Sequence, residues 1–244
     1  MPLVPTDSLP PADVVAVGAH PDDVDVACGG TLARLADQGH QVAIVDLTDG
    51  EPTPNCPDVA TRLDEGDAAA QCMGVAARVQ LDLPNRRLFD GFEPRLALAR
   101  VLRKMRPRVV IGFAGHTPMA SVDHHQAALI TDAAIFYARL SKWDEHFDDP
   151  PCRILRHLYF RMPLEPELLP GNAHHVVVDI TTTLERKLDA IACFATQFDH
   201  KPNFIGRVRS AAETSGSLSG CAAAETFAMA KSMATGDLMR TLNL

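Results

Sequence analysis

Short runs of apolar residues alternate, over residues 14–140, with longer segments whose apolar residues recur at helical spacing. The uninterrupted runs are typical of strands buried on both faces, and the spaced pattern is typical of amphipathic helices. The runs predict strands at 14–18, 42–47, 79–81 and 108–113. The amphipathic segments predict helices at 27–38, 58–73, 94–105 and 123–140. Gly39 and Gly74 follow the first two helices, as glycine often does at a helix end.

The two ends of the chain and its second half are less regular. Residues 1–12 contain four prolines and predict a loose leader, and the polar segment 141–152 predicts a surface excursion. Further strands are predicted at 154–160 and 175–180, followed by a long helix at 183–198. Beyond a loop that contains Gly and Ser, we expect a weak helix at 222–233.

The order of these elements predicts the fold class. Repeated strand–helix units, with strands apolar on both faces, indicate a parallel sheet that helices cover on both sides. We therefore expect an α/β fold, a three-layer sandwich with a mostly parallel sheet. The sequence shows no internal repeat and no convincing boundary, so residues 1–244 are expected to form a single domain.

Composition and charge narrow the class of partner. The chain has 23 basic and 31 acidic residues, a net charge of −8, and 46% hydrophobic residues, enough for a core. A negative surface repels phosphate backbones and anionic lipid, so we expect a small-molecule partner and neither nucleic acid nor a membrane. Six scattered cysteines, an N-terminus unlike a signal peptide and the absence of a long apolar run predict a soluble, cytoplasmic protein.

Polar residues follow two of the predicted strands where each strand ends. The first strand leads to Ala19-His20-Pro21-Asp22-Asp23, and the strand at 108–113 leads through a loop to Asp123-His124-His125. In open parallel sheets, ligands bind beyond the carboxyl ends of the strands, above all where the strand order reverses. If these two ends face one crevice, imidazoles and carboxylates converge there.

His20 and Asp23 are three residues apart on a proline-stiffened turn, so both side chains can point inward. Two histidines and one carboxylate are a common catalytic zinc set, which leaves a position open for water. Asp22 would project to the side and accept a proton from that water. The alternative is an ordinary loop with solvated acids and a helix cap. The position of this loop, directly after a buried strand and before Cys28-Gly29-Gly30, favours the metal site.

With these residues in place, the sequence resembles the PIG-L/LmbE-like family of zinc-dependent N-acetylglucosaminyl deacetylases, and most of all its small bacterial GlcNAc-malate deacetylases of bacillithiol synthesis. Residues 19–51, AHPDDVDVACGGTLARLADQGHQVAIVDLTDGE, are similar to the family's opening motif almost throughout. Further matches are Thr61-Arg62 with Glu65, Met73-Gly74-Val75, Leu83-Pro84-Asn85-Arg86, Arg106-Pro107-Arg108-Val109-Val110, Asp123-His124, Thr196-Gln197-Phe198 and Ala224-Glu225-Thr226-Phe227. The resemblance implies a Rossmann-like fold, a single Zn²⁺, an amino-sugar substrate from which an N-acetyl group is hydrolysed, and a homo-oligomer (trimer or hexamer).

The resemblance also implies roles for single residues. His20, Asp23 and His124 match the family's three metal ligands, and Asp22 matches its general base. Asp123 matches an acidic residue that orients an imidazole, so it is a candidate member of the catalytic group.

Two residues are candidates for substrate binding. Arg62 matches an arginine that contacts the sugar in relatives; the alternative is a solvated helix residue paired with Glu65. Ser121 stands where relatives have a histidine that stabilises the oxyanion or protonates the leaving amine. A serine hydroxyl donates a hydrogen bond but carries no positive charge, and losing one such donor costs about 10²–10³ in turnover.

Other residues bear on this departure from the family. His116 or His125 could supply the imidazole that position 121 lacks. The alternative is that both are ordinary exposed histidines of the loop and the helix. Asn85 replaces an aspartate that is common in relatives, which weakens the transfer of the sugar-binding pattern.

Two rival functions stay open. One is a catalytically weakened homologue that binds zinc and a sugar or amide ligand, which the serine at position 121 keeps open. The other is a nucleotide-binding Rossmann module in which Asp46 takes a ribose hydroxyl. The first turn lacks the G-x-G-x-x-G cradle, and its two carboxylates would repel a pyrophosphate.

Three weaker candidates complete the survey. We expect Cys28 to pack as a small apolar residue rather than to bind a metal. The pair His174-His175 is expected on the surface at the start of a strand, and His200 lies beyond the long helix, where it could line the cleft.

Overall fold

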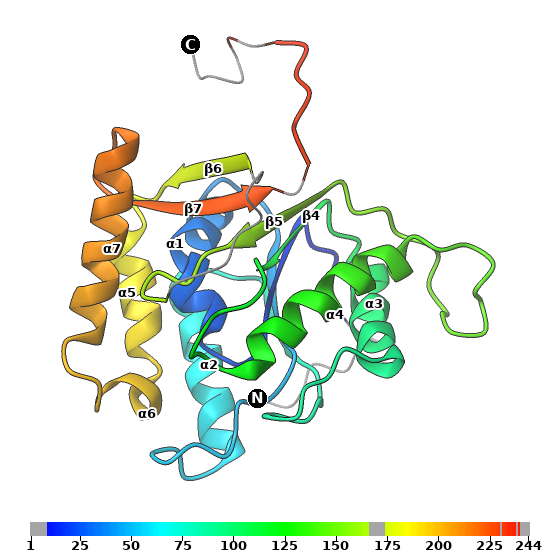
Figure 1. Ribbon diagram of the computed structural model, residues 1–244, viewed down its shortest axis with the longest axis horizontal. Coiled ribbons are helices and arrows are strands. Elements are labelled where there is room, and N and C mark those ends of the chain that lie inside the picture. The colour runs from blue at the N-terminus through cyan, green and yellow to red at the C-terminus, as the bar shows by residue number, and fades with distance from the viewer. Residues whose placement is uncertain (1–8, 166–173, 230, 238, 240–244) are drawn as a thin grey trace.

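Seven strands form one sheet in the computed structural model, which describes residues 9–165, 174–229, 231–237 and 239 (Figure 1). The sheet order is β3-β2-β1-β4-β5-β7-β6. The strands are β1 (Val14–Gly18), β2 (Val42–Asp46), β3 (Ala77–Gln80), β4 (Val109–Phe113), β5 (Arg156–Phe160), β6 (His174–Asp179) and β7 (Ala224–Met229). Of the predicted leader, residues 1–12, the first eight lie outside the described residues.

The strands from β3 to β5 are all parallel, and β7 is antiparallel to both of its neighbours. In the centre, Val14 of β1 is in register with Val42 of β2 and with Val109 of β4. Every residue of β1 and β2 is buried, because helices cover both faces of the sheet. The predicted strands and the mostly parallel sheet are therefore confirmed.

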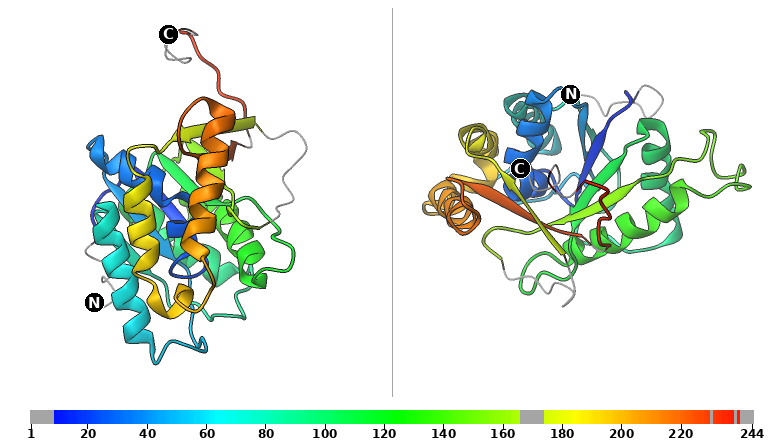
Figure 2. Two further views of the ribbon diagram at one scale, coloured as in Figure 1. Left: turned by 90° about the vertical axis from the view of Figure 1, so that its left-hand side faces the viewer. Right: turned by 90° about the horizontal axis from the view of Figure 1, so that it is seen from above.

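Helices cover the sheet in two layers, which Figure 2 shows edge-on. On one face lie α1, α2, α5 and α7, and on the other lie α3 and α4. The bounds are α1 (Asp23–Asp37), α2 (Val59–Met73), α3 (Phe92–Met105), α4 (Val122–Ala138), α5 (Leu184–Ala192), α6 (Ala195–Phe198) and α7 (Phe204–Ser219). This is the predicted α/β three-layer sandwich. Within the described residues, no helix is both long and apolar enough to cross a bilayer.

The weak helix predicted at 222–233 is wrong, because this segment contains strand β7. Its Ala, Glu and Met residues favour a helix, but pairing with β5 and β6 overrides that preference. The Glu225 side chain is buried, where it accepts hydrogen bonds from the amides of Gly30 and Thr31 and forms an ion pair with Lys187 at 2.6 Å.

The region between residues 183 and 220 also differs from the prediction. The helix predicted at 183–198 is broken into α5 and α6, because Phe194 leaves the helical path and is fully buried beneath the guanidinium of Arg62. The segment read as a Gly- and Ser-containing loop forms α7, which ends at Gly220 in the left-handed conformation.

The first helix brings the site into position. It begins at Asp23 rather than at residue 27, and its predicted start coincides with a kink at Cys28. Both β1 and β4 end at the edge where the chain order reverses, since β2 follows β1 on one side and β4 adjoins it on the other. The loops after these two strands therefore meet at the topological switch point, where ligands bind in this class of fold.

Candidate active site

The turn after β1 holds Asp23 by its own backbone. The Asp23 carboxylate accepts hydrogen bonds from the amides of Ala19, at 3.0 Å, and His20, at 2.9 Å. These bonds close the turn and bring the side chains of His20 and Asp23 to the same side. The predicted inward orientation of both residues therefore follows from a local hydrogen-bond pattern.

His124 reaches the same point from the first turn of α4. Its ring stacks on Phe113, the last residue of β4, with a centroid separation of 4.5 Å and an interplanar angle of 22°. Ser121 caps the helix, since its hydroxyl oxygen accepts a hydrogen bond from the Asp123 amide at 3.2 Å. The cap and the stacked ring leave the imidazole one main direction, toward Asp23.

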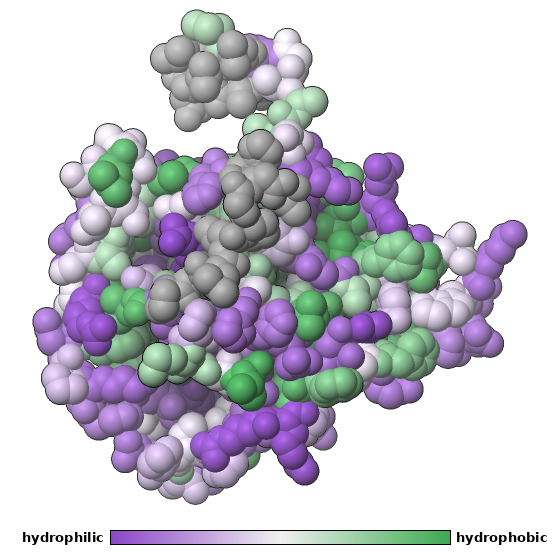
Figure 3. Space-filling view, viewed as in Figure 1, coloured by the Kyte–Doolittle hydropathy of each residue, from purple (hydrophilic) through white to green (hydrophobic). Residues whose placement is uncertain are grey.

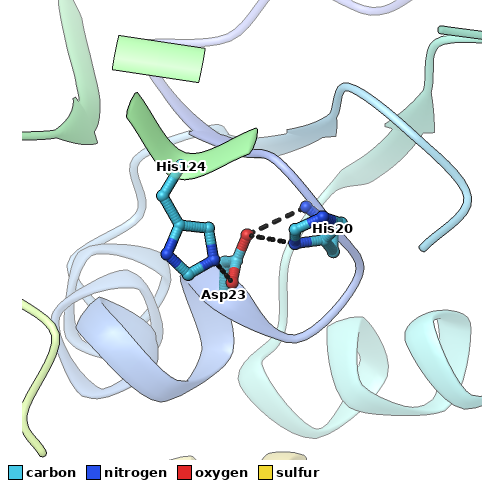
Figure 4. A group of neighbouring side chains, drawn as sticks. All are labelled: His20, Asp23 and His124. Carbon is cyan, nitrogen blue, oxygen red and sulfur yellow. Dashed lines mark hydrogen bonds and ion pairs between the residues drawn. The ribbon is translucent and has the colours of Figure 1, made fainter. Parts of the chain in front are cut away.

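His20, Asp23 and His124 form one compact cluster (Figure 4). His20 Nδ1 lies 3.3 Å from Asp23 Oδ2, and His124 Nε2 lies 3.2 Å from Asp23 Oδ1. One ligand atom from each residue lies within 4.8 Å of the others. Two imidazoles and a carboxylate that converge in this way fit a metal ion, so the cluster could hold one.

The charges of this cluster support one another. Burial opposes ionisation of Asp23, but the two imidazoles outweigh it and hold the pKa of Asp23 well below its ordinary value. Burial likewise opposes charging of His20, yet Asp23 and Asp123 raise the pKa of His20 to about 10. The pocket therefore attracts positive charge, whether a proton or a cation.

Asp123 lies behind His20 and is fully buried. Its carboxylate is 3.3 Å from His20 Nε2 and also accepts hydrogen bonds from the amides of Arg86, at 2.6 Å, and Leu88, at 3.3 Å. Burial would raise the pKa of Asp123, but His20 and these amides lower it. When His20 carries a single proton, an ionised Asp123 holds that proton on Nε2, and Nδ1 is the nitrogen that faces Asp23 as a potential ligand.

Asp22 has a strained backbone, with φ at 129°, between the two candidate ligands of the first turn. Its carboxylate accepts a hydrogen bond from Arg62 Nη2 at 2.8 Å. Burial raises the pKa of Asp22, against the pull of Arg62. A carboxylate with a raised pKa beside a metal cluster is suited to accept a proton.

Arg62 is not the solvated helix residue of the alternative reading, because only 2% of it is exposed. Besides Asp22, it contacts the Pro21 carbonyl, and Glu51 and Glu65 lie 3.9 Å from its guanidinium. Within the part of the chain that the structure describes, its Nε and Nη1 atoms have no hydrogen-bond partner.

A cavity of about 180 Å³ adjoins the cluster, and five of the residues singled out from the sequence line it: His20, Asp22, Arg62, Asn85 and Ser121. A second hollow, of about 590 Å³, also has Asn85 and Arg86 in its lining. The structure therefore brings Arg62 and Ser121 to the same small cavity as His20 and Asp22.

Sequence reasoning did not single out four further residues that line the smaller cavity: Gly50, Thr53, Arg86 and Gln197. Gln197 is held in place because its amide nitrogen donates to the hydroxyl oxygens of Thr53, at 3.0 Å, and Thr196, at 2.9 Å. Gln197 and Arg86 belong to segments that match the family, and this was the available signal. Helical spacing alone assigned Gln197 to a continuous helix.

The alternative histidines do not line this cavity. His116 and His125 pack against each other with rings at 5.8 Å and 89°. His116 is exposed and His125 half-buried. Their positions favour the reading as histidines of the loop and helix.

The weaker candidates lie elsewhere. Cys28 is fully buried, and burial raises the pKa of its thiol, as expected of a packed residue. His175 is exposed on β6, and the side chain of His174 lies outside the described residues. His200 is hydrogen-bonded to Asn55 at the surface, at 2.9 Å, and does not line the cavity.

The geometry around Asp46 weakens the nucleotide-binding alternative. Asp46 is buried, and its carboxylate accepts hydrogen bonds from Arg78 Nε at 2.6 Å and Nη2 at 3.1 Å. The same guanidinium pairs with Asp25 at 3.0 Å. Because Arg78 occupies the carboxylate, Asp46 is a structural residue and is not free to bind a ribose hydroxyl.

Comparisons with known proteins identify similar deacetylases. The chain is similar to a diacetylchitobiose deacetylase of Thermococcus kodakarensis, with 27% identity over 76% of this chain and 70% of that one. A 1D-myo-inositol 2-acetamido-2-deoxy-alpha-D-glucopyranoside deacetylase of Actinosynnema mirum is 28% identical over 77% of this chain and 81% of that one. The structure is similar to the N,N'-diacetylchitobiose deacetylase of Pyrococcus horikoshii, solved with an inhibitor, with a TM-score of 0.77, 25% identity, and coverage of 89% of this chain and 84% of that one.

Family membership rests on the segment that builds the site. Residues 15–135 match the model of the family PIG-L, described as GlcNAc-PI de-N-acetylase. That segment runs from β1 through most of α4, so it contains His20, Asp22, Asp23, Asp123 and His124. The chain therefore contains a PIG-L family domain.

Proposed function

We propose that this protein is a zinc-dependent N-deacetylase that hydrolyses the N-acetyl group, or a related N-acyl group, of an N-acetylglucosamine-type substrate. The observation that carries this proposal is the cluster of His20, Asp23 and His124 with Asp22 beside it, at the wall of a small polar cavity. The relatives named as deacetylases of N-acetylated sugars support the substrate class.

His20, Asp23 and His124 would hold the zinc ion. The donor set fits, since two neutral imidazoles and one carboxylate are a common catalytic zinc set. A zinc ion supplies Lewis acidity that polarises the amide carbonyl of a substrate. The remaining chemistry belongs to the side chains around the cluster.

Asp22 acts as the general base. Its raised pKa and its position at the cavity wall suit it to take a proton from the attacking water and to pass it to the departing amine. Arg62 fixes the Asp22 carboxylate through the 2.8 Å hydrogen bond. Asp123 keeps the imidazole of His20 in one tautomer and orientation.

The polar wall of the cavity binds the sugar. Arg62 and Asn85 line this wall and contribute a guanidinium and a carboxamide. Ser121 offers a hydroxyl proton, because its oxygen already accepts the helix-capping bond. Such a mixture of donors and acceptors matches the hydroxyl groups of a neutral sugar.

A second candidate function is binding of zinc and a sugar or amide ligand without efficient turnover. The observation that favours it is Ser121, which places no positive charge at the cavity wall. The experiment below separates the two candidates.

The test combines metal content with turnover. We expect about one zinc per chain in protein purified without added metal, and hydrolysis of at least one N-acetylglucosaminide in a panel that varies the aglycone. Asp22→Asn should keep the zinc and lower kcat by about 10²–10⁴, whereas His20→Ala and His124→Ala should lose most of the metal.

Two outcomes would contradict this proposal in different ways. Stoichiometric zinc in both His20→Ala and His124→Ala would show that these histidines are not the metal ligands. Zinc binding with no hydrolysis of any N-acetyl sugar would leave the site but favour the binding function.

We also propose that the whole chain forms one such domain, that it assembles as a homo-oligomer (a trimer or hexamer), and that it works in the cytoplasm. One sheet that contains strands from Val14 to Met229 supports the single domain. Six cysteines without a disulfide support a reducing compartment.

A further inference from the structure

Two buried polar atoms face each other on the side of the His124 ring that points away from Asp23. They are His124 Nδ1 and Glu165 Oε2, which lie 3.9 Å apart. Neither atom has a hydrogen-bond partner among the described residues. Glu165 comes from the segment after β5, at the same edge of the sheet as the metal cluster.

The lack of a partner for His124 Nδ1 is important because the other ring nitrogen, Nε2, points into the metal cluster. His124 Nε2 faces Asp23 and is the atom that would bind the metal. An imidazole that binds a metal through Nε2 carries its proton on Nδ1. That N–H is buried and needs an acceptor, since an unsatisfied buried donor is costly.

Glu165 fits this need better than solvent does. Two hydrogen bonds of about 2.8 Å that meet at a water at its preferred angle span about 4.5 Å, whereas these two atoms lie only 3.9 Å apart and both are buried from solvent. A shift of the Glu165 side chain by about 1 Å reaches hydrogen-bond distance. One third of that side chain is exposed, so it has the freedom to move.

His20 provides the comparison within the same site. Its Nε2 is backed by the Asp123 carboxylate at 3.3 Å while its Nδ1 faces Asp23. With Glu165 behind His124, each imidazole of the cluster has one nitrogen toward Asp23 and the other toward a carboxylate. Metal-binding histidines commonly donate their second N–H to a carboxylate, which fixes the ring and strengthens the ligand.

We propose that Glu165 is a positioning residue that accepts a hydrogen bond from Nδ1 of His124 and thereby holds this imidazole for the metal. The inference rests on the proposed metal site and is independent of the identity of the substrate. Glu165 belongs to none of the segments that carry the family resemblance, so it is a residue that only the tertiary structure brings to the site.

The test measures zinc affinity by competition with a chromophoric chelator. Glu165→Ala should weaken zinc binding by about 10–100-fold. Glu165→Gln keeps a carbonyl oxygen that accepts the same hydrogen bond, so it should recover most of the lost affinity. The visible absorption of Co²⁺-loaded protein should shift in Glu165→Ala and return toward that of the unmodified protein in Glu165→Gln.

Glu145→Ala is the matched control. Glu145 Oε1 lies 3.5 Å from Nε2 of His146, but Glu145 is 74% exposed and this pair lies outside the metal cluster. Its removal should leave zinc affinity unchanged. Thermal unfolding of the metal-free variants reports whether each has kept its fold; because Glu165 is partly exposed, we expect all three to do so.

Zinc affinity of Glu165→Ala equal to that of the unmodified protein would overturn the proposal. So would a loss as large in Glu165→Gln as in Glu165→Ala, since the residue would then act through its charge alone. Failure of the metal site itself looks different: His20→Ala and His124→Ala would then bind zinc as tightly as the unmodified protein.

Discussion

Four carboxylates converge on two imidazoles at the edge of the sheet: Asp22, Asp23, Asp123 and Glu165. Arg62 offsets one of them through its ion pair with Asp22. Buried carboxylates are costly without a counter-charge, and their arrangement here therefore favours a bound cation. These carboxylates repel one another when no cation is bound, and the same carboxylates would bind the metal, accept a proton and orient the imidazoles in the proposed reaction.

Ser121 is the residue at which substrate turnover can be probed most directly. Ser121→His removes a helix cap, at a cost of about 1 kcal/mol, and adds an imidazole at the wall of the cavity. If a cationic donor there supports the tetrahedral intermediate, kcat should rise by about tenfold or more while KM changes little. Steady-state kinetics on an N-acetylglucosaminide measure both constants.

The competing explanation predicts a different pattern. If His116 or His125 supplies the donor from a shifted loop, Ser121→His gains nothing. His116→Ala or His125→Ala would then be the damaging change, although neither residue lines the cavity.

At the level of elements, the C-terminal part of the fold depends on close backbone contacts between α7 and β7. The amino-acid composition of these segments does not predict such contacts. Gly216 of α7 lies against the start of β7, where an added Cβ would come within 2.5 Å of the Ala223 amide nitrogen. β7 in turn places Glu225 under α1 and α5, through Gly30, Thr31 and Lys187. The helix that holds Asp23 is therefore supported by the last strand of the sheet.

Gly216→Ala should destabilise the protein, even though alanine favours a helix by about 1 kcal/mol. The clash is with backbone atoms that cannot rotate away, so we expect a net loss of about 1–3 kcal/mol in the free energy of unfolding. Ser217→Ala, at the neighbouring exposed position of α7, is the control and should be neutral or slightly stabilising. Denaturant unfolding of both variants measures the difference; equal stability would mean that α7 and β7 can move apart.

For the whole molecule, the most conspicuous unexplained surface lies along α4. Val122, Leu129 and Phe136 recur every seven residues on this helix and are 72%, 38% and 47% exposed. Met119, directly before the helix, and Phe89, beside it, are also exposed, and Figure 3 shows apolar side chains over α4 and near its start. We call these five residues the α4 patch. An apolar patch of this kind indicates a contact surface between proteins.

We expect copies of this chain to associate through the α4 patch. Leu129→Glu with Phe136→Glu should lower the mass measured by light scattering toward that of one chain, because each glutamate would place a charge in the contact. Leu218→Glu is the control, since Leu218 is 85% exposed but lies on α7. A single-chain mass for the unmodified protein at micromolar concentration, or an unchanged mass in the double variant, would contradict this expectation.

The sequence by itself determined the features that depend on neighbours along the chain. Apolar runs identified the buried strands, glycines identified the ends of α1 and α2, and His20, Asp22 and Asp23 stood together on one turn. Their relation to His124 could be predicted as well, because parallel strands deliver their carboxyl ends to one edge.

Only the tertiary structure decided the features that depend on contacts distant in sequence. Local propensity favoured a helix where β7 forms, because pairing with β5 and β6 leaves no mark on the spacing of apolar residues. The sequence left Arg62 open between a sugar-binding residue and a solvated helix residue, and only its burial against Asp22 and Phe194 excluded the solvated one. Glu165 and Gln197 lie 41 and 73 residues beyond His124; Glu165 follows β5, and Gln197 lies in α6. Hydrophobic periodicity records which face of an element is buried, but it does not record which residue of another element that face meets.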